Sequence, residues 1–185
     1  HALAPGTFDP PRFRLGDCGT QRNLSDEGRA QARRIGEWFQ ARQLQPSKVL
    51  SSPWCRCIDT ATLAFGAPQV WAPLGSPRGY PETTGAAHLR ALRDALAAAS
   101  ARSGRFEVWV SHMFVQADLA QDSTRSGEAL ILRQRGGAAS LPAQEHVVGH
   151  ESCHVAHPNH SPAFWAAVAR VMPDYKARQA LLKGR

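Results

Sequence analysis

The sequence contains no long apolar run. None of its stretches approaches the roughly 18 consecutive apolar residues of a membrane-spanning helix, and it does not open with the pattern of a secretory leader. It also shows no internal repeat and no low-complexity tract. We therefore expect a soluble protein without a membrane partner, in a bacterial-type cytoplasm or periplasm, and the choice between these compartments stays open.

Cysteines are few. The four of them, Cys18, Cys55, Cys57 and Cys153, match neither the spacing of a zinc ribbon nor the disulfide framework of a small secreted domain. The single residue between Cys55 and Cys57 also disfavours a bridge between those two. Cysteine usage therefore does not decide the compartment.

Acidic side chains are in the minority. There are 15 aspartates and glutamates against 22 lysines and arginines, which gives a formal net charge of +7. The basic residues are spread along the chain without a dense block, so their field attracts anions in general, phosphate esters as well as nucleic acid. Because the sequence does not interleave basic with aromatic residues, we expect no nucleic-acid partner.

The sequence does contain a regular alternation of helix-like and strand-like segments. A chain of 185 residues, 43% of them hydrophobic, can bury one sizeable core. The clearest helix signal follows Ser25, a capping residue, with Asp26 and Glu27 in the first turn. The alternation predicts an α/β fold, a three-layer α/β/α sandwich with a mainly parallel central sheet. We expect helices at residues 26–42, 53–65, 84–100 and 161–171, and strands at 48–51, 106–111, 129–132 and 146–148.

Polar side chains follow two of the predicted strands directly. Arg56 comes shortly after the first strand, and His112 comes directly after the strand at 106–111. Ligands of open α/β sheets gather outside the carboxyl ends of the strands. Together with His1, at the head of a proline- and glycine-rich loop over residues 1–20, these side chains are expected to place two imidazoles and a guanidinium in one pocket.

Two runs of sequence resemble the motifs of a known family. Residues 20–32, TQRNLSDEGRAQA, resemble a helix motif Leu-Ser/Thr-x-x-Gly-x-x-Gln-Ala, and residues 49–61, VLSSPWCRCIDTA, resemble a following Ser-Ser-Pro, Arg and Thr-Ala motif. His1 and Ala2 resemble the end of an Arg-His-Gly/Ala motif, and His112 resembles a second histidine at a strand end. In order and spacing, the chain resembles the histidine phosphatase superfamily, the phosphoglycerate mutase-like proteins, over residues 1–135.

The resemblance implies a metal-independent hydrolase, a phosphatase that works through a phosphohistidine and needs no cofactor. His1 would be the nucleophile, because a neutral imidazole nitrogen attacks phosphorus readily. Arg56 and a protonated His112 would clamp the transferring phosphoryl group. Glu82 would be the general acid, with Glu128 and Asp59 as alternatives. The substrate would be a phosphorylated small molecule or a phosphoprotein, with further contacts from Arg14, Arg22, Ser52 and Ser111.

The chain departs from the family pattern at two places. The arginine that precedes the nucleophilic histidine, and the strand that leads into it, would lie before residue 1. Met113 and Phe114 follow His112, where small or polar residues are expected. The absent arginine favours a second hypothesis, a catalytically impaired phosphate-binding or interaction module on the same fold, because a fold does not dictate an activity.

Residues 150–185 have no counterpart in that family, and we place a domain boundary between 149 and 150. His150, His154 and His157 have the spacing of metal ligands on one helix face, but Pro158 argues against a continuous helix. The prediction is no metal site, with these three histidines as the candidates for one. A third hypothesis is accordingly a metal-binding protein that uses this tail, or the amine and imidazole of His1.

Overall fold

The computed structural model describes residues 1–75, 84–132 and 147–148. The chain divides into two compact units, His1–Gly127 and Glu128–Arg185. Every residue of the candidate site described below belongs to the first unit. The boundary expected between 149 and 150 falls outside the described residues and stays a prediction.

The first unit is built on a three-stranded parallel sheet of order β2-β1-β3. The central strand β1 (Lys48–Ser51) pairs with β2 (Gln69–Val70) on one side and with β3 (Glu107–Val110) on the other. The two longer strands confirm the segments predicted at 48–51 and 106–111. The two residues of β2 were not predicted, because so short a strand carries no readable period.

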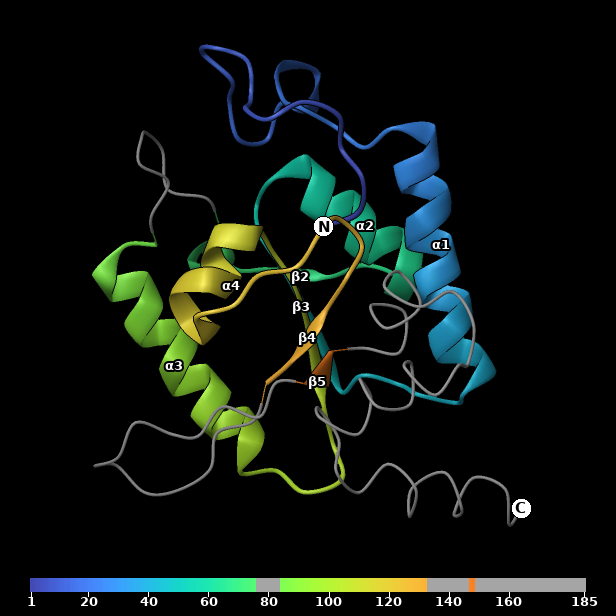
Figure 1. Cartoon of the computed structure of the whole chain (residues 1–185), viewed down its shortest axis with the longest axis vertical. Coiled ribbons are helices and arrows are strands. Elements are labelled where there is room, and N and C mark those ends of the chain that lie inside the picture. Colours follow the sequence, from blue (N-terminus) through green and yellow to red (C-terminus); the bar gives the residue numbers. More distant parts are fainter. Residues whose placement is uncertain (76–83, 133–146, 149–185) are drawn as a thin grey trace, which may run out of the picture. The chain divides into compact units, whose positions relative to one another are not determined.

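Helices cover both sides of this sheet (Figure 1). The helices α1 (Asp26–Ala41) and α2 (Cys55–Phe65) pack against each other on one side, and α3 (Ala86–Ser100) and α4 (Met113–Ala120) lie on the other. Two short 3₁₀ turns, η1 (Cys18–Thr20) and η2 (Ala72–Leu74), complete the unit. The arrangement is the expected α/β fold with a parallel sheet, and the helices predicted over 26–42, 53–65 and 84–100 are confirmed.

The helix ends follow from local chemistry. The Ser25 hydroxyl caps α1 by accepting the N–H of Gly28 at 3.1 Å, as predicted. The second helix begins at Cys55 rather than at Pro53, because Trp54 has an extended backbone. The helix α4 was not predicted, since its sequence, MFVQADLA, is apolar on most sides and has no helical period.

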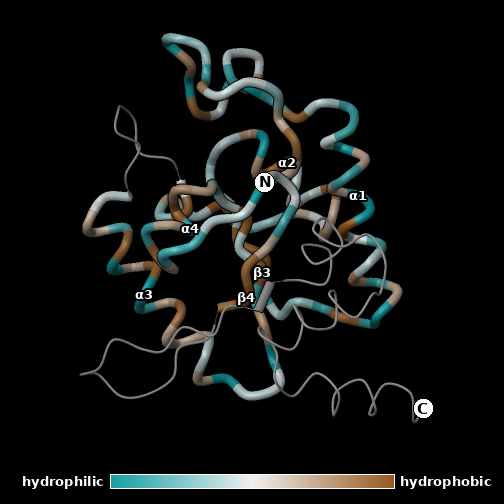
Figure 2. The backbone as a smooth tube through the Cα atoms, viewed as in Figure 1, coloured by the Kyte–Doolittle hydropathy of each residue, from teal (hydrophilic) through white to brown (hydrophobic). Residues whose placement is uncertain are grey.

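The core of the first unit lies between the sheet and α2. Trp54, Cys57, Ala61 and Val110 form one buried cluster there. Figure 2 shows β3 as a hydrophobic segment and α1 with hydrophilic stretches, which fits a strand that lines the core and an amphipathic helix with one face in solvent. The sheet and α2 therefore form the rigid base on which the loops at the carboxyl ends of the strands rest.

The second unit contains one described feature, an antiparallel pair of β4 (Leu130–Ile131) and β5 (Val147–Val148). This pair confirms the strands predicted at 129–132 and 146–148. The helix predicted at 161–171 lies outside the described residues. Within the described part of the chain, no helix has the length and apolar character needed to cross a membrane.

Candidate active site

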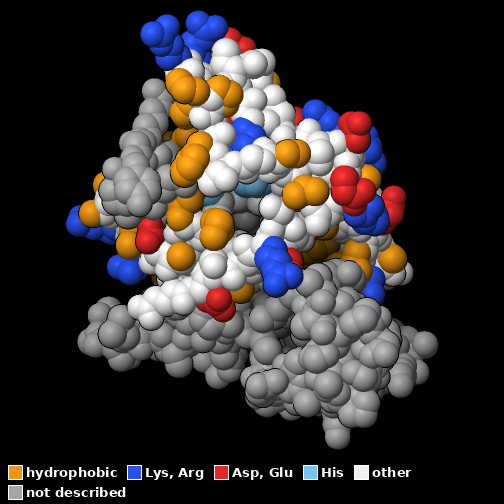
Figure 3. All heavy atoms as spheres, turned by 45° about the horizontal axis from the view of Figure 1, so that its top comes forward, with side chains coloured by type: hydrophobic (Ala, Val, Ile, Leu, Met, Phe, Trp, Pro, Cys, Tyr) orange, Lys and Arg blue, Asp and Glu red, His pale blue; other side chains and the backbone are white. Residues whose placement is uncertain are grey.

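Three side chains from distant parts of the chain meet at the carboxyl ends of β1 and β3. The rings of His1 and His112 lie edge to face with their centroids 5.4 Å apart. Arg56 donates from Nε to Nε2 of His1 over 3.3 Å, and from Nη2 to Nδ1 of His112 over 3.4 Å. The structure thus brings together the three residues that the sequence singled out. Figure 3 shows histidine side chains within a hollow bordered by hydrophobic ones.

The backbone of the first residues fixes His1 in this place. The α-nitrogen of His1 donates to the Ser111 carbonyl over 2.8 Å, and the N–H of Ala2 donates to Oγ1 of Thr60 over 3.0 Å. The next N–H along the chain donates to Oε1 of Gln31 over 2.9 Å. Thr60 and Gln31 are the Thr-Ala and Gln-Ala motif residues, so these motif positions hold the His1 segment in place.

Gly28 allows α1 to approach that same segment. A Cβ at this position would lie 2.0 Å from the carbonyl oxygen of Leu3, far inside contact distance. The same oxygen accepts the N–H of Ser25 at 3.2 Å, so helix and segment are locked together. The glycine of the helix motif is therefore required by packing and not by an unusual backbone angle.

Hydrogen bonds define the tautomer of His1. Its Nδ1 lies 2.8 Å from the Ala2 carbonyl oxygen, and because a carbonyl only accepts, Nδ1 carries the proton. The other ring nitrogen, Nε2, then carries no proton, and its lone pair accepts the Nε–H of Arg56. This leaves Nε2 of His1 as the nucleophilic nitrogen of the cluster.

His112 is buried and neutral. Its Nε2 lies 2.8 Å from Oγ of Ser52, and its Nδ1 accepts from Arg56, so the ring proton is on Nε2. Burial lowers the pKa of His112 well below its ordinary value of 6.5, and the Arg56 guanidinium lowers it further. The expectation of a protonated His112 is therefore corrected for the ligand-free protein. A phosphate dianion beside the ring would favour the charged form and raise this pKa.

Asp9 balances the charge of Arg56. The two side chains are 10% and 5% exposed, and Nη1 of Arg56 donates to both carboxylate oxygens of Asp9, over 2.9 and 3.1 Å. No sequence signal indicated this contact, because a loop aspartate next to proline is typical of a turn. Asp9 is thus a site residue that only the fold reveals.

A disulfide between Cys18 and Cys55 joins the first loop to the start of α2. The cysteine spacings did not predict it, because the two residues are 37 positions apart and only the fold brings them together. Cys57 is free and buried, with Sγ 3.6 Å from Nε2 of His112. Burial raises the pKa of the Cys57 thiol, which keeps it protonated and unreactive.

The predicted phosphate-binding serines serve other partners. The Ser52 hydroxyl contacts His112, so it orients that ring. The Ser111 hydroxyl donates to the carbonyl of Leu74 over 2.6 Å, and so fixes η2 to the end of β3. Both residues support the cluster, and their role as phosphate ligands stays a prediction.

The two predicted arginines differ in position. Arg22 lies beside the cluster, because its carbonyl accepts from Arg56 over 3.4 Å and its main-chain N–H donates to Asp9 over 2.9 Å. Arg14 is paired with Asp17 at 2.6 Å, and its side chain is 73% exposed. The structure therefore keeps Arg22 as a candidate and places Arg14 on the solvent side of the loop.

Of the three acid candidates, only Asp59 can be placed relative to the cluster. Glu82 lies outside the described residues. Asp59 pairs at 3.3 Å with Arg29, so it faces α1 instead of the imidazoles. Glu128 is the first residue of the second unit and is described only with that unit. The general acid therefore stays a prediction.

The metal candidates His150, His154 and His157 also lie outside the described residues. Within the described ranges, no group of three or more histidine, cysteine, aspartate or glutamate side chains is arranged to hold a metal ion.

Comparison with known families gives two matches in different parts of the chain. Residues 16–74 match the model of the histidine phosphatase superfamily, branch 1. Residues 123–185 match the model of a YgjP-like metallopeptidase domain. The second match draws attention to the pattern His150-Glu151-Ser152-Cys153-His154, an H-E-x-x-H motif whose Glu151 the sequence reasoning missed.

Among solved structures, the open reading frame Rv3214 from Mycobacterium tuberculosis is similar, with 22% identity and a TM-score of 0.50 over 71% of this chain and 86% of that one. The putative phosphohistidine phosphatase SixA from Agrobacterium tumefaciens is similar with 19% identity and a TM-score of 0.51, over 76% of this chain and 91% of that one. At such identities the likeness concerns the fold. No curated protein matches the chain.

Proposed function

We propose that this chain, whose residues 16–74 match the histidine phosphatase superfamily model, hydrolyses a phosphomonoester through a phosphohistidine on His1. The observation that carries the proposal is the placement of the Arg56 guanidinium between two imidazoles, one of which presents an unprotonated Nε2 to it. This is the donor set that phosphoryl transfer requires, a nucleophile together with a fixed cationic clamp.

The reaction would proceed in two displacements. Nε2 of His1 attacks phosphorus, the bond from phosphorus to the ester oxygen breaks, and the leaving alkoxide takes a proton from an acid for which Glu82 is the candidate. Water then attacks the phosphohistidine and gives a proton back to that acid. The phosphorus–nitrogen bond breaks, which releases inorganic phosphate and free His1.

Arg56 would supply most of the charge stabilisation. In the ligand-free state its Nε–H and Nη2–H point toward the ring nitrogens of His1 and His112, and a phosphoryl group entering between the rings would accept both. The negative charge of that phosphoryl group would also favour protonation of His112. His112 would thereby become a second cationic donor only when substrate is bound.

The test is hydrolysis of an aryl phosphate in the presence of a metal chelator. We expect chelator-resistant turnover that is lost in His112→Ala and retained in His88→Ala, a matched control whose histidine is exposed on α3, outside the cluster. Absence of turnover in a folded wild-type protein, assayed also with phosphoproteins as substrates, would favour the alternative of a phosphate-binding module.

A second candidate function belongs to the other end of the chain. The H-E-x-x-H pattern at 150–154, within the segment that matches a metallopeptidase model, supports metal binding by His150 and His154, with Glu151 as a general base. Metal content after purification tests this. We expect bound zinc that is lost in His150→Ala and in His154→Ala, whereas full zinc occupancy in both variants would refute it.

A further inference from the structure

Asp9 is held by more donors than an ordinary loop carboxylate. Besides the two bonds from Arg56, its Oδ2 accepts from Nε1 of Trp54 over 3.1 Å, and its Oδ1 accepts from the main-chain N–H of Arg22 over 2.9 Å. Trp54 is 3% exposed, so these bonds form away from water. A buried carboxylate that accepts four hydrogen bonds from three donor nitrogens has a fixed orientation.

The bonds divide the Arg56 guanidinium into two sides. Nη1 is committed to Asp9, whereas Nε and Nη2 form the opposite edge and face His1 and His112. This second edge is the planar fork that binds two phosphoryl oxygens at once. Asp9 therefore occupies the nitrogen that the fork does not use, and it does not cover the place where phosphate would bind.

We propose that Asp9 is a positioning residue, which turns the Nε and Nη2 fork of Arg56 toward the transferring phosphoryl group; this inference rests on the proposed phosphatase function. A freely rotating guanidinium would present its fork in the productive direction only part of the time. Loss of such alignment costs catalysis because the clamp acts on the transition state, where a small displacement lowers the rate strongly.

A positioning role and a simple charge effect predict opposite changes in phosphate affinity and in rate when Asp9 is neutralised. Asp9 is an anion beside an anion-binding site, so by charge alone its neutralisation would strengthen phosphate binding and raise the rate. If its function is to orient Arg56, neutralisation weakens phosphate binding and lowers the rate. Asn at this position has one acceptor oxygen, and its NH₂ group would face donors.

The experiment compares Asp9→Asn with Asp17→Asn. Both aspartates lie in the first loop and pair with an arginine, but Asp17 contacts the exposed Arg14. We expect kcat/KM for an aryl phosphate to fall about 10- to 100-fold in Asp9→Asn, mostly through kcat, and to stay near the wild-type value in Asp17→Asn. The Ki of inorganic phosphate as a competitive inhibitor rises in the first variant alone.

A second background separates orientation from general damage to the fold. Lysine has no fork to orient, so Asp9→Asn introduced into Arg56→Lys should lower kcat/KM by less than about threefold. An equally large loss in both backgrounds, an unchanged kcat/KM in Asp9→Asn, or tighter phosphate binding in that variant would each overturn the proposal.

The proposed function can fail on its own. If the wild-type protein hydrolyses nothing, calorimetric titration with inorganic phosphate still compares wild type, Asp9→Asn and Asp17→Asn. Weaker binding in Asp9→Asn alone keeps the orienting role of Asp9 in a binding site. Equal binding in all three proteins, or no binding by the wild type, would refute the proposed role of Asp9.

Discussion

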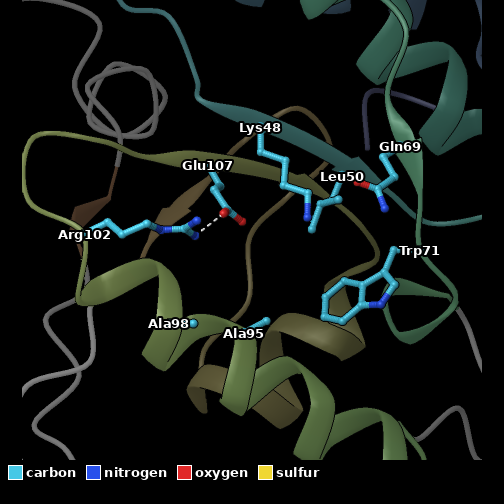
Figure 4. Close-up of a pocket in the computed structure, with 8 residues that line it drawn as sticks. All are labelled: Lys48, Leu50, Gln69, Trp71, Ala95, Ala98, Arg102 and Glu107. Carbon is cyan, nitrogen blue, oxygen red and sulfur yellow. Dashed lines mark hydrogen bonds and ion pairs between the residues drawn. The ribbon is translucent and has the colours of Figure 1, made fainter.

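The two ends of β1 and β3 both carry polar groups, but they are organised differently. At the carboxyl ends, His1, Arg56 and His112 converge, and we call these residues the carboxyl-end cluster. At the amino ends, Lys48 and Glu107 line a cavity of about 340 Å³ between the sheet and α3, the amino-end cavity (Figure 4).

In the amino-end cavity the carboxylate of Glu107 is already paired. Glu107 pairs with Arg102 across the cavity wall and also accepts from Nε1 of Trp109 over 2.9 Å. In the carboxyl-end cluster the Nε and Nη2 donors of Arg56 point at unprotonated ring nitrogens, and the oxygens of a phosphoryl group can replace these nitrogens as acceptors. A hollow lined by charged residues therefore does not by itself indicate a binding site, whereas a guanidinium whose donors face uncharged acceptors does.

The largest effect is expected when the carboxyl-end cluster loses its nucleophile. In His1→Ala, no nitrogen can accept the phosphoryl group, so turnover should fall by at least about 1,000-fold. Acid quenching of the wild type with labelled phosphomonoester should trap protein-bound phosphate, and the variant should trap none. Label trapped equally in the variant would assign the nucleophile to another residue.

Removal of the disulfide tests how far the first loop stabilises the carboxyl-end cluster. Cys18→Ser frees the loop from Cys55, and because the cross-link spans 37 positions, the variant should lose about 2–4 kcal/mol of unfolding free energy. Urea unfolding measures the loss. Reductant should destabilise the wild type similarly and leave the variant unchanged, and a variant as stable as the oxidised wild type would contradict this account.

Gly28→Ala tests the close approach of α1 to the His1 segment. The added Cβ meets the Leu3 carbonyl at 2.0 Å, so the segment must shift, at a cost of about 1–3 kcal/mol and with lower kcat/KM. Gly19→Ala is the control, because its Cβ would meet only Oδ1 of Asp17, at 3.5 Å. Thermal unfolding and kinetics of the pair should differ clearly, and equal behaviour would show that the helix yields without cost.

The helices and the longer strands could be predicted because their signals are local. Ser25 caps α1 as its position indicated, and the strand that ends on Ser111 is where the apolar run placed it. The convergence of His1, Arg56 and His112 was also predictable, since parallel strands bring their carboxyl ends to one edge.

The features that were not predicted are contacts between residues far apart in the sequence, which no local pattern indicates. Asp9 reaches Arg56 and Cys18 reaches Cys55 only because the first loop folds over the start of α2. The low pKa of His112 in the ligand-free protein was not predicted for a related reason, because the depth of burial of a strand-end residue is a tertiary property. Ser111 likewise turns its hydroxyl to Leu74, which periodicity does not reveal.

The burial of His112 makes stability depend on pH. The unfolded chain binds a proton near the ordinary pKa of 6.5, whereas the folded ring binds one only at lower pH, so protons favour unfolding. Stability is fully present above 6.5 and falls below it, by at most about 1.4 kcal/mol per pH unit for this residue. Unfolding curves of His112→Gln should show a shallower slope, and parallel slopes would argue against a buried neutral ring.

A substitution at the amino-end cavity should have little effect, because this end of the sheet lies away from the carboxyl-end cluster. Glu107→Gln removes the charge that faces Arg102, but Arg102 is 51% exposed and water screens the pair, so stability should change by less than about 1 kcal/mol. Because Glu107 begins β3 whereas His112 follows its end, kcat/KM should stay within about twofold of wild type. A loss as large as that of the Asp9 variant would mean that the sheet transmits changes from one end to the other. In that case the two ends would differ in geometry, but both would be needed for activity.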